Sequence, residues 1–337
     1  MNAKGKAPAN SAQFIFIFLG LLTAFGPFVT DMYLPSLPAM VKYFDTSVSM
    51  VQTGLTFSML GLAFGQLVFG PLSDKYGRRL PLLVSLFLFI AATFACIFAP
   101  TIEIFVALRF LQGIAASGGI VIARSIATDK FKRRSKEKLM ESFTMFKTVL
   151  KNRRYLFYTL ELAFAMAILF AYIAASPFII QQHYGFSAFA FSLFFAANAV
   201  AIGAGAAVSV KFGSPERCLV ISCVGMIVCS AALAAAMAVG VTVVWFEILL
   251  FGLCFMMGLS FTVATTLAMD AARRQAGTAS AFMGASGFWA GSIVSPLAGW
   301  GNIMISTGII LVVSALGASL FAFLAGRENN LTVGGGK

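Results

Sequence analysis

A few ionisable and polar side chains lie within long apolar runs of this sequence, and these side chains could do chemistry. Asp31 lies near the end of the run 13–34, and Arg109 and Gln112 lie one helical turn apart in the run 103–125. A charged group at mid-bilayer costs about 2.5–3.5 kcal/mol on insertion scales, so such groups are usually functional. At about 1.5 Å of rise per residue, Asp31 and Arg109 lie at similar depth. They could pair with each other or face one aqueous cavity.

Two interpretations of Asp31 stay open at this point. As a partly buried carboxylate, it could bind a proton or a cation, so that substrate and proton compete for it. Alternatively, its side chain extends to the membrane interface and caps the end of its helix. Arg109 keeps its charge in any protein environment. We therefore expect a functional or conformational role for Arg109.

Two further groups in the second half of the sequence are candidates for a substrate site. Glu247 lies in the run 242–266 at a depth comparable to that of Asp31, and its role is open between function and structure. Tyr172 is a candidate for lining a cavity, as are Met256 and Met257, whose flexible side chains suit varied ligands.

Glu161 is expected to have a structural role. It lies near the start of the run 156–178 and follows Lys151, Arg153 and Arg154 closely. We predict that it forms a salt bridge with one of these bases at the membrane interface.

The sequence offers no catalytic or metal-binding constellation. His183 is the only histidine, and no cysteine or second histidine stands near it, so a metal site is not expected. The five cysteines fall within apolar runs, which favours free packing thiols: Cys96, Cys218, Cys223, Cys229 and Cys254. We find no nucleophile–base pair and no phosphate-binding glycine loop. An enzyme is therefore not expected, nor is a cofactor.

The elements that position these residues are predicted to be membrane-spanning helices. The chain has 337 residues, is 60% hydrophobic and only 11% charged, and has a mean hydropathy of +0.92. A single soluble core stops growing near about 250–300 residues and could not hide this much apolar surface. A span needs roughly 20 mostly apolar residues, and ten runs qualify: 13–34, 50–69, 80–99, 103–125, 156–178, 188–210, 218–238, 242–266, 278–298 and 303–325. The fold class is an all-α polytopic membrane protein.

The basic residues predict the topology. The net charge is +12, and with the N-terminus in the cytoplasm, 22 of the 24 Lys and Arg residues fall on the cytoplasmic side. The exceptions are Lys42 and Arg109. This is the pattern of the positive-inside rule, so the charge does not indicate a nucleic-acid partner. We predict that both termini are cytoplasmic and that the basic segments contact membrane lipid.

The spans divide into two groups around one long hydrophilic stretch. We predict an incomplete N-terminal bundle of four spans in 1–129, a basic linker in 130–154, and a C-terminal six-helix bundle with a short tail in 155–337. Within the linker, four apolar residues recur at helical spacing: Leu139, Phe143, Phe146 and Leu150. A basic amphipathic helix of this kind lies in the membrane interface, where it could bind anionic lipid or, alternatively, a regulatory partner.

One polar stretch between two apolar runs resembles a known family signature. Gly70–Arg79, expected to be a ten-residue hairpin, reads G-x-L-S-D-K-x-G-R-R. It resembles the loop signature of the major facilitator superfamily of transporters, and Arg109–Gly113 resembles the R-x-x-Q-G element of that superfamily. The resemblance implies that the loop braces the inner ends of the two halves against the span 278–298. Its implied gating residues are Gly70, Asp74, Gly77, Arg78 and Arg79.

Other segments are similar to the Bcr/CflA group of bacterial drug:proton antiporters: Thr30–Pro38, Ser176–Phe178, Tyr184–Ser187 and Ala276–Ala281. This resemblance implies a bacterial inner-membrane protein that exports small hydrophobic or cationic drugs in exchange for protons by alternating access. Asp31 would then contact the proton or the cation, and Arg109 would be its electrostatic partner.

The family pattern has twelve spans, whereas ten are counted here. Matched by motif, the fifth and sixth spans of the family are missing, with the junction near Phe131. The alternative to export is therefore a transport-incompetent, shortened member that acts as a membrane remnant or an interaction protein.

Overall fold

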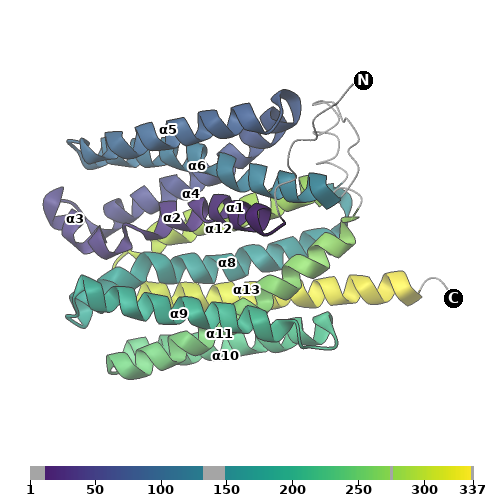
Figure 1. Ribbon diagram of the computed structural model, residues 1–337. Helices are drawn as coiled ribbons and strands as arrows, with labels where there is room; N and C mark the ends of the chain where they lie inside the picture. Colours follow the sequence, from purple (N-terminus) through teal and green to yellow (C-terminus); the bar gives the residue numbers. More distant parts are fainter. Residues whose placement is uncertain (1–11, 132–148, 274–275, 335–337) are drawn as a thin grey trace, which may run out of the picture.

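The computed structural model describes residues 12–131, 149–273 and 276–334, and the regular elements in these ranges are all helices (Figure 1). The N-terminal half comprises α1 (Ala12–Thr23), α2 (Phe25–Asp31), the 3-10 turn η1 (Leu34–Ser36), α3 (Leu37–Tyr43), α4 (Val48–Tyr76), α5 (Arg79–Ile97) and α6 (Ile102–Phe131). The C-terminal half comprises α8 (Arg153–Phe178), the π-helical turn η2 (Ile179–His183), α9 (Ala188–Ser209), α10 (Pro215–Val239), α11 (Val243–Ala271), α12 (Ala276–Ala298) and α13 (Ile303–Gly334).

The prediction of an all-α membrane protein is confirmed. In the described part of the chain, nine helices are long and apolar enough to cross a membrane. The predicted span 278–298 is not among these nine, although it forms the helix α12. Its sequence is rich in glycine and serine, because α12 packs between α4 and α8 and needs small residues for close approach.

The first predicted span is broken into two helices. Pro27 has no backbone N–H, so the carbonyl group of Thr23 loses its helical partner, and α1 ends at Thr23. The second helix, α2, ends at Asp31, and the turn η1 leads into α3. The break thus places Asp31 at a helix end.

Helix α4 is longer than the sequence predicts. The prediction of a ten-residue hairpin at Gly70–Arg79 is wrong, because most of these residues are helical. Helix α4 continues through Tyr76, and α5 begins at Arg79. The turn consists of Gly77 and Arg78. Gly77 has φ +81°, a conformation that residues with a side chain rarely adopt, and this ends the helix.

Each half contains one pair of helices in close contact through glycine. A Cβ atom at Gly113 of α6 would lie 2.2 Å from the carbonyl oxygen of Ser58 on α4. A Cβ atom at Gly258 of α11 would likewise lie 2.1 Å from the carbonyl oxygen of Ile202 on α9. Helices associate in lipid through such packing, because the hydrophobic effect does not drive them together there.

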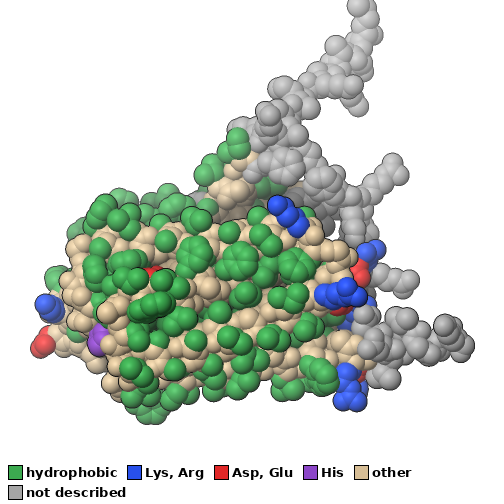
Figure 2. All heavy atoms as spheres, turned by 90° about the horizontal axis from the view of Figure 1, so that it is seen from below, with side chains coloured by type: hydrophobic (Ala, Val, Ile, Leu, Met, Phe, Trp, Pro, Cys, Tyr) green, Lys and Arg blue, Asp and Glu red, His purple; other side chains and the backbone are tan. Residues whose placement is uncertain are grey.

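The basic side chains lie mainly at one end of the molecule. Figure 2 shows Lys and Arg gathered at one end of the visible face, with hydrophobic side chains covering the surface between the ends. We call this the basic end; the C-terminal ends of α4, α9 and α13 lie there (Figure 1), and near them the sequence has Lys75, Lys211 and Arg327. The end that carries η2 and His183 is called the opposite end.

The two halves are joined by hydrogen bonds near the opposite end. The side-chain amide of Gln52 on α4 donates to the carbonyl oxygen of Ala174 on α8 at 2.9 Å. The amide of Gln181 donates to the carbonyl oxygen of Pro35 at 3.1 Å. Gly299, just after α12, leaves the space that the Gln52 side chain occupies. These contacts hold the halves together at that end.

The predicted amphipathic helix lies almost wholly outside the described residues. Leu139, Phe143 and Phe146 fall in 132–148, and the structure is described again from Val149. The division into 1–129, 130–154 and 155–337 therefore stays a prediction.

We expect the substitution Gly113→Ala to destabilise the N-terminal half by about 1–3 kcal/mol, because its new methyl group would overlap backbone atoms of α4. Gly203→Ala is the matched control, since a Cβ atom there meets nothing within 4 Å. Thermal unfolding of the purified protein in detergent measures both variants. Equal unfolding temperatures would contradict the packing described here.

Candidate functional site

Arg109 is the centre of a polar cluster in the N-terminal half. Its side chain is only 5% exposed. The guanidinium group donates to the carbonyl oxygen of Val29 on α2 and to Oε1 of Gln112, and it lies 4.0 Å above the ring of Tyr33. The amide of Gln112 donates in turn to the hydroxyl group of Thr93 on α5 at 2.7 Å. One cation thus connects α2, α5 and α6.

The broken first span explains why the Val29 carbonyl is available. The last four carbonyl groups of a helix have no partner within that helix, and Val29 lies in the last turn of α2. In lipid no water can satisfy such a group. The guanidinium group supplies the missing hydrogen bond, so the helix break and the buried cation satisfy each other.

Asp31 and Arg109 do not form the direct ion pair that the sequence allowed. Tyr33 interacts electrostatically with both groups. However, no carboxylate oxygen of Asp31 lies within 4.0 Å of the guanidinium nitrogens of Arg109. The oxygen Oδ1 of Asp31 is buried without a hydrogen-bond partner. The guanidinium donors are instead directed to Val29 and Gln112. The oxygen Oδ1 of Asp31 is therefore left without a hydrogen-bond donor.

A second polar cluster lies in the C-terminal half. The side-chain amide of Asn198 on α9 donates to the Tyr172 hydroxyl on α8 at 3.2 Å and to Oε2 of Glu247 on α11 at 2.9 Å. Asn198 is 1% exposed. Tyr172 and Glu247 are among the residues expected from the sequence, whereas Asn198 is not. An amide in the middle of an otherwise apolar span was the available signal, because it must find a partner in lipid.

The two clusters approach each other across the boundary between the halves. Asp31 lies within electrostatic range of the Tyr172 hydroxyl. The Tyr172 ring also stacks on Phe195, with ring centroids 5.9 Å apart. No hydrogen bond or ion pair joins Asp31 to Tyr172, Asn198 or Glu247, all of which the structure describes.

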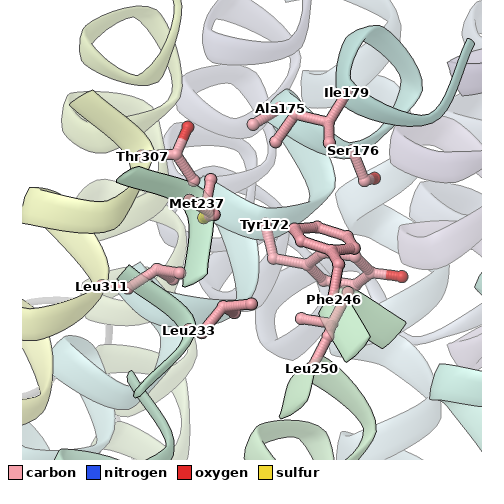
Figure 3. A pocket seen from close by; sticks show the side chains of 10 residues that line it. All are labelled: Tyr172, Ala175, Ser176, Ile179, Leu233, Met237, Phe246, Leu250, Thr307 and Leu311. Atoms are coloured by element: carbon pink, nitrogen blue, oxygen red, sulfur yellow. The ribbon is translucent and has the colours of Figure 1, made fainter. Parts of the chain in front are cut away.

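Tyr172 also lines a small cavity within the C-terminal half (Figure 3). Its volume is only about 10 Å³, little more than one water molecule needs, and α8, η2, α10, α11 and α13 supply the walls. Drug-sized ligands occupy pockets of about 300–1,000 Å³, so this cavity is small for such a ligand. Met256 and Met257, two other candidates, do not line it.

The implied gating residues lie at the end of α4 and the start of α5. The guanidinium group of Arg78 donates to the hydroxyl group of Ser73 at 2.5 Å. Gly70 is within α4, Gly77 forms the turn and Arg79 is exposed. The side chain of Asp74 lies outside the described part of the structure. A brace between this loop and α12 stays a prediction.

The prediction for Glu161 is wrong. Glu161 is 0% exposed inside the C-terminal half and forms no salt bridge with Lys151, Arg153 or Arg154, all of which the structure describes. Of the bases near it in sequence, Arg153 pairs with Glu328 at 3.8 Å, and Arg154 lies over the ring of Tyr158. Helix α8 starts at Arg153, eight residues before Glu161, which carries this carboxylate deeper than a span starting at 156 suggests.

Comparison with known proteins points to one family. The sequence model described as Major Facilitator Superfamily matches residues 19–146 and 132–296. The MFS-type transporter YdgK of Bacillus subtilis (strain 168) is 31% identical over 392 aligned positions, which cover 95% of this chain and 98% of that protein.

Other relatives match over part of their length. The bicyclomycin resistance protein homolog of Haemophilus influenzae is 34% identical over 40% of this chain and 34% of that protein. Multidrug resistance protein D of Escherichia coli (strain K12) is 29% identical over 35% of this chain and 30% of that protein. Among solved structures, a D-xylose–proton symporter superposes with a TM-score of 0.64 at 15% identity, covering 91% of this chain and 96% of that one.

We expect the substitution Arg109→Lys to lower the free energy of unfolding by about 1.5–3 kcal/mol, since an ammonium group cannot serve Val29 and Gln112 while stacking on Tyr33. Arg217→Lys, at an exposed position of α10, is the matched control. Thermal unfolding in detergent measures both. An Arg109→Lys protein as stable as the control would show that charge alone suffices.

Proposed function

Because the chain belongs to the Major Facilitator Superfamily, we propose that it exports small hydrophobic or cationic drugs in exchange for protons, by alternating access, across the bacterial inner membrane. Membership makes the chain a multi-pass membrane transporter and not an enzyme. The names of the relatives support the substrate class, since two of them are called bicyclomycin and multidrug resistance proteins.

The observation that carries the proposal is the unpaired carboxylate of Asp31 at the boundary between the halves. Its oxygen Oδ1 has no partner, and the Tyr172 hydroxyl of the other half lies within electrostatic range. Such a group can exchange a proton for a cationic substrate. Glu247 and Asn198 extend the polar surface on the other side of the substrate position.

The contacts between the halves support alternating access. The positive-inside rule puts the basic end in the cytoplasm, so the hydrogen bonds of Gln52 and Gln181 lie on the external side. We infer from these bonds that this conformation is closed toward the outside. Rocking of the two bundles about a central site would break these bonds and open a route to the outside.

A second candidate function is that of a shortened, transport-incompetent member. The 392 positions aligned with the Bacillus subtilis relative exceed the 337 residues of this chain by 55, so that relative has residues with no counterpart here. Helix α5 is also the least buried of the nine candidate spans. Both observations favour the absence of helices that would lie beside α5. The predicted junction at which these helices are missing is near Phe131.

Drug accumulation in bacterial cells separates the two candidates. If the chain exports drugs, its expression should lower the accumulation of a cationic dye, and a protonophore should abolish the difference. Cells that carry the empty vector are the control. If expression lowers the accumulation of none of a panel of cationic and neutral compounds, the second candidate is favoured.

We expect Asp31→Asn to reduce the export of cationic compounds at least tenfold without loss of membrane insertion, because the amide cannot bind a proton or neutralise a cation. Asp45→Asn is the matched control. Asp45 is exposed in the turn before α4, and its φ of +47° is one that asparagine tolerates. Unchanged export by the Asp31→Asn protein would remove Asp31 from the mechanism.

A further inference from the structure

Glu161 is a fully buried carboxylate that the proposed substrate site does not use. It lies on α8, about 12 Å from the start of the helix by the rise per residue. The Ser260 hydroxyl on α11 donates to its Oε1 at 2.5 Å, and the Cys223 thiol on α10 approaches the same oxygen at 4.0 Å. The other oxygen, Oε2, is buried without a hydrogen-bond partner.

No described cation forms an ion pair with Glu161. The cations of its own helix are Arg153, which pairs with Glu328, and Arg154, which lies two turns earlier over the ring of Tyr158. The titratable groups that face Glu161 are the Cys223 thiol from α10 and the Tyr158 phenol from α8. Helices α9 and α12 carry no charged residue. The charged residues of α10, α11 and α13 lie toward the ends of these helices. They are Glu216 and Arg217 on α10, Glu247 and Asp270 on α11, and Arg327 and Glu328 on α13.

An ionised carboxylate in this position would be energetically costly. Even after relaxation, a buried ion pays a penalty of several kcal/mol unless a counter-charge or several hydrogen bonds compensate it. Glu161 has one short hydrogen bond to one oxygen and none to the other. Binding a proton removes the charge and leaves a neutral acid that still accepts from Ser260.

We propose that Glu161, with Ser260 and Cys223, forms a second proton-binding site, within the C-terminal bundle and separate from the Asp31 cluster. In the conformation described here Glu161 holds its proton. Its release requires that α8 separate from α10 and α11, so that water enters and accepts the proton, which leaves a solvated carboxylate. The coupling of this step to export rests on the proposed function, whereas proton binding itself does not.

Infrared difference spectroscopy of the purified protein in lipid tests proton binding directly. As the pH is changed, wild-type protein should show the carbonyl band of a protonated carboxyl group, and this band should be absent from the Glu161→Gln protein. The Asp31→Asn protein should keep it. Because the spectrum requires no transport, the band would persist even if the export proposal failed.

A substitution of the hydrogen-bond donor gives an independent test that leaves Glu161 in place. Ser260→Ala should shift the band to higher wavenumber, because the carboxyl oxygen loses its donor. Ser319→Ala is the matched control; Ser319 bonds to the carbonyl oxygen of Cys223 and not to Glu161. The comparison of Ser260→Ala with Ser319→Ala tests the proposal even if the Glu161→Gln protein does not fold.

Two results would overturn the proposal. One is a set of spectra in which Glu161→Gln and wild type do not differ and Ser260→Ala has no effect. The other is a Glu161 band that responds to Na⁺ at constant pH and not to pH, since the site would then bind a metal cation.

Discussion

A guanidinium group that keeps its charge inside a membrane needs hydrogen-bond acceptors or an aromatic face beside it, and this constraint organises the N-terminal half. Arg109 meets it with the free carbonyl group of Val29, the side chain of Gln112 and the ring of Tyr33. Each partner lies on a segment whose position is thereby fixed. The same arrangement directs the guanidinium donors away from Asp31, whose oxygen Oδ1 is buried without a hydrogen-bond partner.

The C-terminal half solves a related problem with the opposite charge. Its polar cluster is built around a carboxylate, Glu247, held by the neutral amide of Asn198, which also engages Tyr172. Both halves bring one pair of helices together through glycine, as at Gly113 and Gly258. The halves thus share a packing scheme but differ in the charge at the centre of the polar cluster, a guanidinium group in one half and a carboxylate in the other.

The sequence predicted nine of the ten spans and placed Gln112 one helical turn from Arg109, because hydropathy and helical spacing are local properties. It did not predict that Asp31 and Arg109 stay apart, since that depends on the Val29 carbonyl released by a helix break. Burial of Glu161 was likewise missed, because Ser260 and Cys223 come from helices far away in the sequence. The helix end at Tyr76 was misplaced because polarity suggested a loop, whereas the backbone of Gly77 decides it.

Helix α8 gives these separate features a mechanical connection. It is the most buried of the nine candidate spans, and it carries Glu161 toward the basic end, Tyr172 at the boundary site and the Ala174 carbonyl that Gln52 holds. A helix hydrogen-bonded along its length moves largely as one body. A displacement that frees Ala174 from Gln52 therefore also shifts Glu161 relative to Ser260. Proton release in the C-terminal half and opening at the opposite end can then be two consequences of one movement.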